Sequence, residues 1–89
     1  MKFKVEITAA GFSMVDDDFT ITLKRGTVTK TFEKSELVYN QDGFFLCFDT
    51  SEFGTGVVTA IIRAEVPDND FEDGYRTEVY KMDFMIIDK

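Results

Sequence analysis

The chain has 89 residues, 44% hydrophobic and 30% charged, which is the balance of a small globular domain and excludes fibrous or fully disordered proteins. Its 10 Lys and Arg side chains against 17 Asp and Glu give a formal net charge of −7 at pH 7. Proteins bind the phosphate groups of nucleic acids through Lys and Arg, and a surface with this excess of carboxylates repels phosphates. We therefore expect no nucleic-acid partner. We expect one domain over residues 1–89.

The absent residue types exclude several kinds of chemistry. The chain has no histidine and one cysteine, Cys47, which excludes a disulfide within the chain and a zinc site of clustered histidine and cysteine. A serine or cysteine nucleophile would lack a histidine base, and no nucleophile motif is present. We therefore expect a protein that is not an enzyme and needs no cofactor. Cys47 itself is predicted to be a buried core thiol.

The N-terminal sequence argues against export. Met1 is followed by alternating charged and apolar residues, which interrupt the apolar segment that a signal peptide needs. Unbroken apolar runs are short throughout, whereas a helix that spans a bilayer needs about 20 apolar residues. The sequence thus predicts a soluble protein, cytoplasmic as synthesised, with no membrane partner.

A period-two alternation of apolar and polar residues runs through the chain and predicts strands. The first strand is expected over residues 2–9. After an acidic loop at residues 16–18, two alternating segments at 19–24 and 28–32 flank Gly26. Glycine supplies the positive φ of a tight turn, so these two segments are predicted to form a hairpin.

The middle of the chain contains shorter elements. Polar residues 33–36 form a crossover, with one helical turn expected near its end, and lead to a short strand at 37–39. A turn at 40–43 precedes a strand at 44–48 that carries apolar residues on both faces. Apolar residues on both faces predict a central strand.

The last third consists of two long strands. A loop at 49–56 leads to a strand at 57–66, and a second loop at 67–74 begins with proline, which cannot donate to a sheet ladder. The final strand is expected over 75–87. It alternates at Tyr80, Met82, Phe84 and Ile86. Val79 is out of phase with that alternation, which predicts a β-bulge there.

Seven short strands with frequent turns and no helical repeat predict an all-β fold. The most favoured architecture is a two-sheet antiparallel sandwich of immunoglobulin-like character, and the alternative is a small Greek-key barrel. The cysteine pair and tryptophan of true immunoglobulin domains are absent.

The acidic loop after Pro67 is a candidate metal site. Its oxygen ligands recur at nearly alternate positions, as a calcium ion requires, and comprise Asp68, Asp70, Glu72 and Asp73. The EF-hand pattern fails, because Asp73 stands where the turn glycine belongs and Val79 where the bidentate glutamate belongs. Calcium binding is therefore weighed against a solvated acidic loop.

Three aromatic residues are candidates for binding a partner: Phe53, Phe71 and Tyr75. The two phenylalanines lie in polar loops, where an aromatic ring either caps the end of a sandwich or anchors a partner. Tyr75, together with Tyr39 and Tyr80, would alternatively form a platform on which a sugar stacks.

One part of the chain resembles a known kind of module. Residues 42–56 contain an Asp-Gly turn, an alternating strand, an Asp-Thr-Ser step and a Gly-x-Gly turn, and a long apolar strand follows at 57–67. This arrangement is similar to immunoglobulin-like modules of tailed-phage virion proteins, in particular the N-terminal domain of baseplate upper proteins. Residues 75–79 are similar to sequence in prophage and mobile-element proteins of gut anaerobes. The resemblance implies a small assembly or adaptor module that is incorporated into a virion.

These observations leave three function hypotheses. The first is a non-enzymatic structural or protein-interaction module of a phage tail, baseplate or mobile element, which binds a protein partner or itself. The second is a carbohydrate-binding module. The third is an acidic decoy that inhibits a nucleic-acid-binding protein, and it requires both acidic loops to lie at one end of the molecule. Lys2 and Lys4 on the first strand are the kind of charges that discourage unwanted strand pairing.

Overall fold

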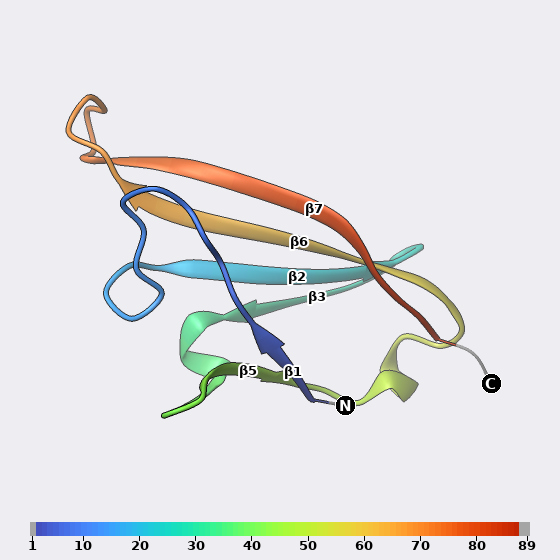
Figure 1. Ribbon diagram of the computed structural model, residues 1–89. Coiled ribbons are helices and arrows are strands. Elements are labelled where there is room, and N and C mark those ends of the chain that lie inside the picture. The colour runs from blue at the N-terminus through green and yellow to red at the C-terminus, as the bar shows by residue number, and fades with distance from the viewer. Residues whose placement is uncertain (1, 88–89) are drawn as a thin grey trace.

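The computed structural model describes residues 2–87, and within β7 it describes no side chain at position 82 or at positions 84–87. In this part of the chain seven strands and two short 3₁₀ helices alternate with loops (Figure 1). They are β1 (Lys2–Val5), β2 (Phe19–Arg25), β3 (Val28–Glu33), η1 (Lys34–Glu36), β4 (Val38–Asn40), β5 (Gly43–Cys47), η2 (Thr50–Glu52), β6 (Gly56–Pro67) and β7 (Tyr75–Ile87).

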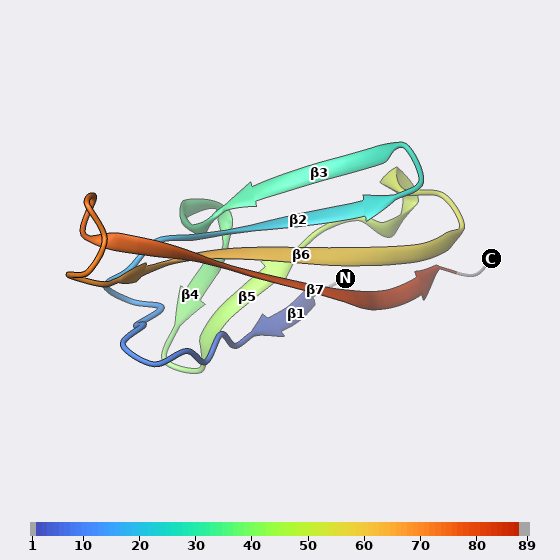
Figure 2. The same cartoon turned by 90° about the horizontal axis from the view of Figure 1, so that it is seen from above.

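The strands form two antiparallel sheets that pack face to face (Figure 2). The larger sheet has the order β3-β2-β6-β7 and the smaller one the order β1-β5-β4. If the strands are lettered from B, these orders read C′-C-F-G and B-E-D, which is the immunoglobulin arrangement without its first strand. The sandwich is confirmed, and the barrel alternative is wrong because the described strands form two separate sheets rather than one closed sheet.

The β2–β3 hairpin confirms the prediction made from its sequence pattern. Its ladder runs from Thr20 opposite Glu33 to Arg25 opposite Val28. Gly26 in the turn has a φ of 56°, a conformation that strongly favours glycine. The first strand is shorter than predicted, since β1 ends at Val5, but the alternation of half-buried and exposed side chains continues along the chain to residue 10.

β5 is the central strand of the smaller sheet, as predicted, but its two faces differ. Phe44 and Leu46 point into the sandwich and are buried, whereas Phe45 is only half-buried. Cys47 is exposed, so its assignment as a buried core thiol is wrong. A central strand is covered by neighbours at its two edges, but the outer face of a two-layer sandwich still faces solvent.

The β6–β7 ladder contains the predicted bulge at a different place. Val58 lies opposite Met85 and Thr59 opposite Asp83, so Phe84 is the extra residue. Val79, the predicted position, is in regular register with Arg63 and is simply 53% exposed. The predicted alternation at Met82, Phe84 and Ile86 concerns side chains outside the described part. Pro67 was expected in the loop but is the last residue of β6, opposite Tyr75.

The core lies between the sheets and is rich in phenylalanine. Phe19 of β2 meets Phe44 of β5 edge to face, with ring centroids 5.6 Å apart, and this contact joins the two sheets. Fully burying such a ring stabilises the fold by about 1.5–3 kcal/mol relative to leaving it in water. The buried residues are Phe19, Ile21, Leu23, Leu37, Phe44, Leu46, Phe48, Phe53, Val58, Ala60, Ala64 and Val66.

Candidate functional site

Both acidic loops lie at the same end of the sandwich, beyond the start of β2 and the end of β6 (Figures 1 and 2). The backbone N–H of Glu65 donates to the carbonyl of Asp18 over 2.9 Å, which joins β6 to the first loop. We call this region the acidic end. Its carboxylates belong to Asp16, Asp17, Asp18, Glu65, Asp68, Asp70, Glu72 and Asp73. The sequence left open whether the loops meet, and the structure brings them together.

The loop before β2 is held in place by hydrogen bonds between Ser13 and Asp17 and by one lysine. The N–H of Ser13 donates to Oδ2 of Asp17 over 2.8 Å, and the N–H of Asp17 donates to the Ser13 carbonyl, also over 2.8 Å. Lys34 Nζ donates to the carbonyls of Val15 and Asp17 over 2.7 and 2.8 Å. One cation therefore fixes the base of an acidic loop while the Asp16 and Asp18 side chains stay exposed.

Arg76 joins the two loops of the acidic end. Its Nη1 donates to Oδ2 of Asp68 over 2.9 Å, and its Nη2 donates to the carbonyl of Ala10 over 3.3 Å. Oδ1 of Asp68 accepts from the N–H of Asp70 over 3.0 Å. The Asp70 amide, and then the Arg76 guanidinium, hold the pKa of Asp68 below its ordinary value of 3.8. The bond to Asp68 in turn raises the pKa of Arg76.

Removing the guanidinium is expected to raise the pKa of Asp68 only partway toward 3.8, because the stronger contribution, the Asp70 amide, remains. A carboxylate with a lowered folded-state pKa stabilises the fold above its unfolded-state pKa, and this contribution disappears as the pH falls through the lowered value. The carboxyl carbon shift of Asp68, followed by NMR titration in the parent and in Arg76→Ala, measures both values. Identical titration curves would contradict the assigned contact.

The four calcium candidates do not converge. Within residues 2–87 no group of three or more carboxylate, cysteine or histidine side chains has an arrangement that could hold a metal ion. Asp68 is instead engaged by Arg76, and the Asp68 N–H donates to the Gly74 carbonyl over 2.8 Å to close the loop. Protein contacts thus account for the conformation of this loop.

Two predicted partner-binding aromatics lie at the acidic end, each about half exposed. Phe71, in the β6–β7 loop, is 50% exposed, and Tyr75, the first residue of β7, is 49% exposed. Tyr75 lines a hollow of about 260 Å³ together with Glu65 and residues 16–18. Val15 is 57% exposed in the neighbouring loop, and sequence reasoning missed it because it directly follows apolar Met14 and nothing in the pattern marks it as exposed.

Phe53 lies in the core of the sandwich rather than on its surface. It was a candidate because it lies in a polar loop, but its side chain is 0% exposed. The short helix η2 turns the chain so that the ring points between the sheets, where it meets Phe48 edge to face at 5.7 Å. Nε of Arg25 also donates to the Phe53 carbonyl, which fixes the backbone at this position.

The three tyrosines of the sugar-binding hypothesis do not form a platform. Tyr39 is on β4 of the smaller sheet and packs on Phe44 with ring centroids 4.4 Å apart. Tyr75 is on the larger sheet, and Tyr80, on the same strand, is half-buried beside Ile62. Each tyrosine lines a different hollow, so the described structure offers no shared stacking surface.

Comparison of the chain with protein-family models, curated proteins and solved structures gave no match. Within residues 2–87, no helix has the length and apolar character needed to cross a lipid bilayer.

Proposed function

We propose that this protein is a non-enzymatic interaction module that docks through its acidic end onto a basic surface of a protein partner. The observation that carries the proposal is the placement of exposed Val15, Phe71 and Tyr75 among eight carboxylates at one end of the sandwich. Aromatic anchors within a charged rim are typical of binding sites between proteins. The resemblance to virion modules supports assembly as the setting.

Charged and apolar groups of the acidic end contribute to binding in different ways. The carboxylates attract a basic partner over a Debye length of about 8 Å at physiological salt and raise the rate of association. The aromatic rings then supply the apolar area that holds the complex. Arg76 and Lys34 hydrogen-bond to the loops of the acidic end, so the exposed rings lie on an ordered surface. Such pre-organisation reduces the entropy lost on binding.

The test compares matched variants in pull-downs from the source cells, followed by measurement of the dissociation constant of each captured partner. Phe71→Ala and Tyr75→Ala are expected to weaken binding about tenfold or more. Val57→Ala is the control, because Val57 is 47% exposed but lies near the start of β6, at the far end of that strand from the acidic loops. Binding should also weaken as salt rises. A partner that is retained equally by all three variants would exclude the acidic end as the docking surface.

A second candidate function is the acidic decoy, and the gathering of both acidic loops at one end favours it. A decoy presents carboxylates in place of phosphates, so duplex DNA should compete with this protein for the captured partner. In that case neutralising Asp16, Asp18 and Asp70 to Asn should abolish binding, while Phe71→Ala and Tyr75→Ala should have little effect. The docking proposal predicts the opposite order of effects.

A further inference from the structure

A hollow beside the acidic end continues the docking surface onto the smaller sheet. It lies between the end of β1, the loop before β2 and the turn from β4 to β5, and its volume is about 290 Å³. Val15, an exposed side chain of the acidic end, lines it, and so does Tyr39 of β4, which is 58% exposed. Its lining residues all fall within positions 4–44. We call it the Tyr39 hollow.

The more deeply placed lining side chains of the Tyr39 hollow are apolar. Phe44 is buried, and the ring of Tyr39 packs on it with centroids 4.4 Å apart. Val5 and Met14, both half-buried, also line the hollow. Exposed polar residues at the β4–β5 turn, among them Asp42, complete the lining. An apolar lining with a polar rim is the arrangement of a binding site for an apolar side chain.

Hydrogen bonds fix the walls of the Tyr39 hollow. The backbone N–H of Ile7 donates to Sδ of Met14 over 3.3 Å, and Lys34 Nζ donates to the Val15 carbonyl over 2.7 Å. The N–H of Asp42 donates to Oδ1 of Asn40 over 2.8 Å, a bond that holds the β4–β5 turn. The hollow is therefore preformed, which lowers the entropy lost when a ligand binds.

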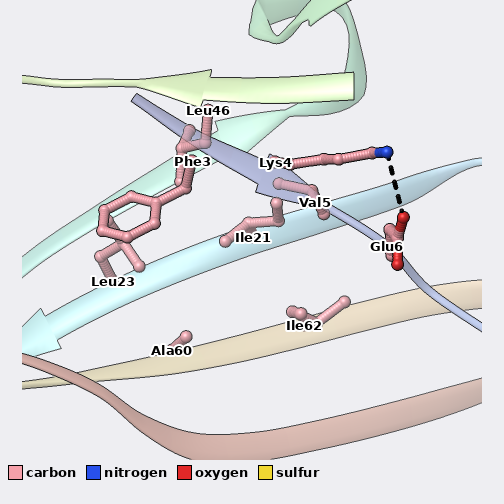
Figure 3. A pocket seen from close by; sticks show the side chains of 9 residues that line it. All are labelled: Phe3, Lys4, Val5, Glu6, Ile21, Leu23, Leu46, Ala60 and Ile62. Carbon is pink, nitrogen blue, oxygen red and sulfur yellow. Dashed lines mark ion pairs between the residues drawn. The ribbon is translucent and has the colours of Figure 1, made fainter. Parts of the chain in front are cut away.

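The charges around the Tyr39 hollow favour a basic ligand. Lys4 and Glu6 are paired with each other at 3.3 Å, as Figure 3 shows, and so cancel. Within residues 2–87, neither the Asp42 carboxylate at the hollow nor that of Asp16, which follows Val15, forms an ion pair. A second copy, itself carrying a net charge of −7, is repelled, whereas a basic segment is attracted.

We propose that the Tyr39 hollow binds one large apolar side chain of the partner protein, flanked in the partner's sequence by lysines or arginines. This inference rests on the proposed function, because it names the kind of segment that docks beside the acidic end. The hollow exceeds the cavity of about 150 Å³ that holds benzene, so it has room for a phenylalanine ring. The flanking cations pair with Asp42 and Asp16.

The probe is a peptide, blocked at both ends, with one phenylalanine between two pairs of lysines. The matched control has alanine in place of phenylalanine. We expect saturable binding of the phenylalanine peptide, about tenfold tighter than that of the control, with changes in the NMR amide signals of residues 14–15 and 39–44. Equal binding of the two peptides, no binding of either, or signal changes confined to other residues would overturn the proposal.

Variants of the protein test the apolar and the charged part of the site. Tyr39→Ala should weaken binding of the phenylalanine peptide about tenfold, whereas Tyr39→Phe keeps the ring and should bind as the parent does. Asp42→Lys should weaken binding by a similar factor. Asp73→Lys makes the same change of charge in the β6–β7 loop and should have a much smaller effect. If Tyr39→Ala fails to fold, Asp42→Lys, made at an exposed turn position, still decides, and its unchanged affinity would overturn the proposal.

The same variants separate failure of this inference from failure of the proposed function. A captured partner that Phe71→Ala and Tyr75→Ala release, but that Tyr39→Ala and Asp42→Lys retain, would overturn the inference and leave the proposed function standing. Peptide binding at the hollow, with partners retained by Phe71→Ala and Tyr75→Ala, would support the hollow and contradict docking through those two rings. Dimers in light scattering that Tyr39→Ala abolishes would make a second copy the occupant and overturn the inference.

Discussion

Replacing Phe53 with alanine is expected to lower the free energy of unfolding by about 3–5 kcal/mol. The ring is fully buried and meets Phe48 edge to face, so its removal leaves a cavity in the core. The structure cannot collapse fully around this cavity, because Asp49 caps η2 by accepting from the Ser51 N–H and Arg25 holds the Phe53 carbonyl. For a domain of this size, with a total stability of about 5–12 kcal/mol, this is a large fraction.

Urea unfolding followed by circular dichroism measures this loss. Phe71→Ala is the matched control, since it removes the same ring from a position that is half in solvent. Its effect on stability should lie within about 0.5 kcal/mol, as for most surface substitutions. The two variants thus separate the phenylalanine that belongs to the core from the one proposed to bind a partner. Similar losses in both would contradict that distinction.

Sequence patterns predicted the elements well wherever the decisive interaction was local. The β2–β3 hairpin depends on Gly26 and on two adjacent alternating segments, all within a short stretch of chain. The central position of β5 in its sheet was also predicted, because apolar residues fill both of its faces. These features require no knowledge of which distant strands pair.

The wrong predictions concern residues whose surroundings the sequence does not specify. They depend on whether a second sheet covers a face, on which residues lie opposite each other in a ladder, or on how a loop turns. Cys47 shares the apolar character of β5, but its face of the smaller sheet has no layer above it. The bulge was assigned to Val79 from phase alone, whereas the register with β6 places the extra residue at Phe84. Phe53 lies among polar residues, and only the turn of η2 sends its ring inward.

The candidate site was predictable in composition but not in assembly. Both acidic loops were visible in the sequence, as were Phe71 and Tyr75. Their meeting depends on the antiparallel pairing of β2 with β6, which places Phe19 opposite Ala64 and so brings the loop before β2 beside the loop after β6. Three strands separate β2 from β6 along the chain, so no local pattern indicates this pairing.

Phe19→Ala is expected to cost about as much as Phe53→Ala, about 3–5 kcal/mol, for a reason connected with the acidic end. Phe19 is 1% exposed and follows Asp18 directly, so its ring anchors the acidic loop to the core. Its edge-to-face contacts reach Phe12 at 6.3 Å and Phe44 at 5.6 Å. Lys34 Nζ lies 5.9 Å from the centre of the Phe19 ring and also donates to the carbonyl of Asp17 in the loop.

A double-mutant cycle separates the ring contact from general loss of core volume. Phe19→Ala, Phe44→Ala and the double variant should show a coupling energy of about 0.5–1.5 kcal/mol, the value of an aromatic pair beyond its buried area. Leu23→Ala with Phe44→Ala serves as the control cycle, because Leu23 is equally buried on β2 but has no ring. Additive losses in the Phe19 cycle would contradict the expected coupling between the two rings. Coupling specific to Phe19 would show that its ring contact with Phe44 stabilises the fold beyond the area that the two side chains bury.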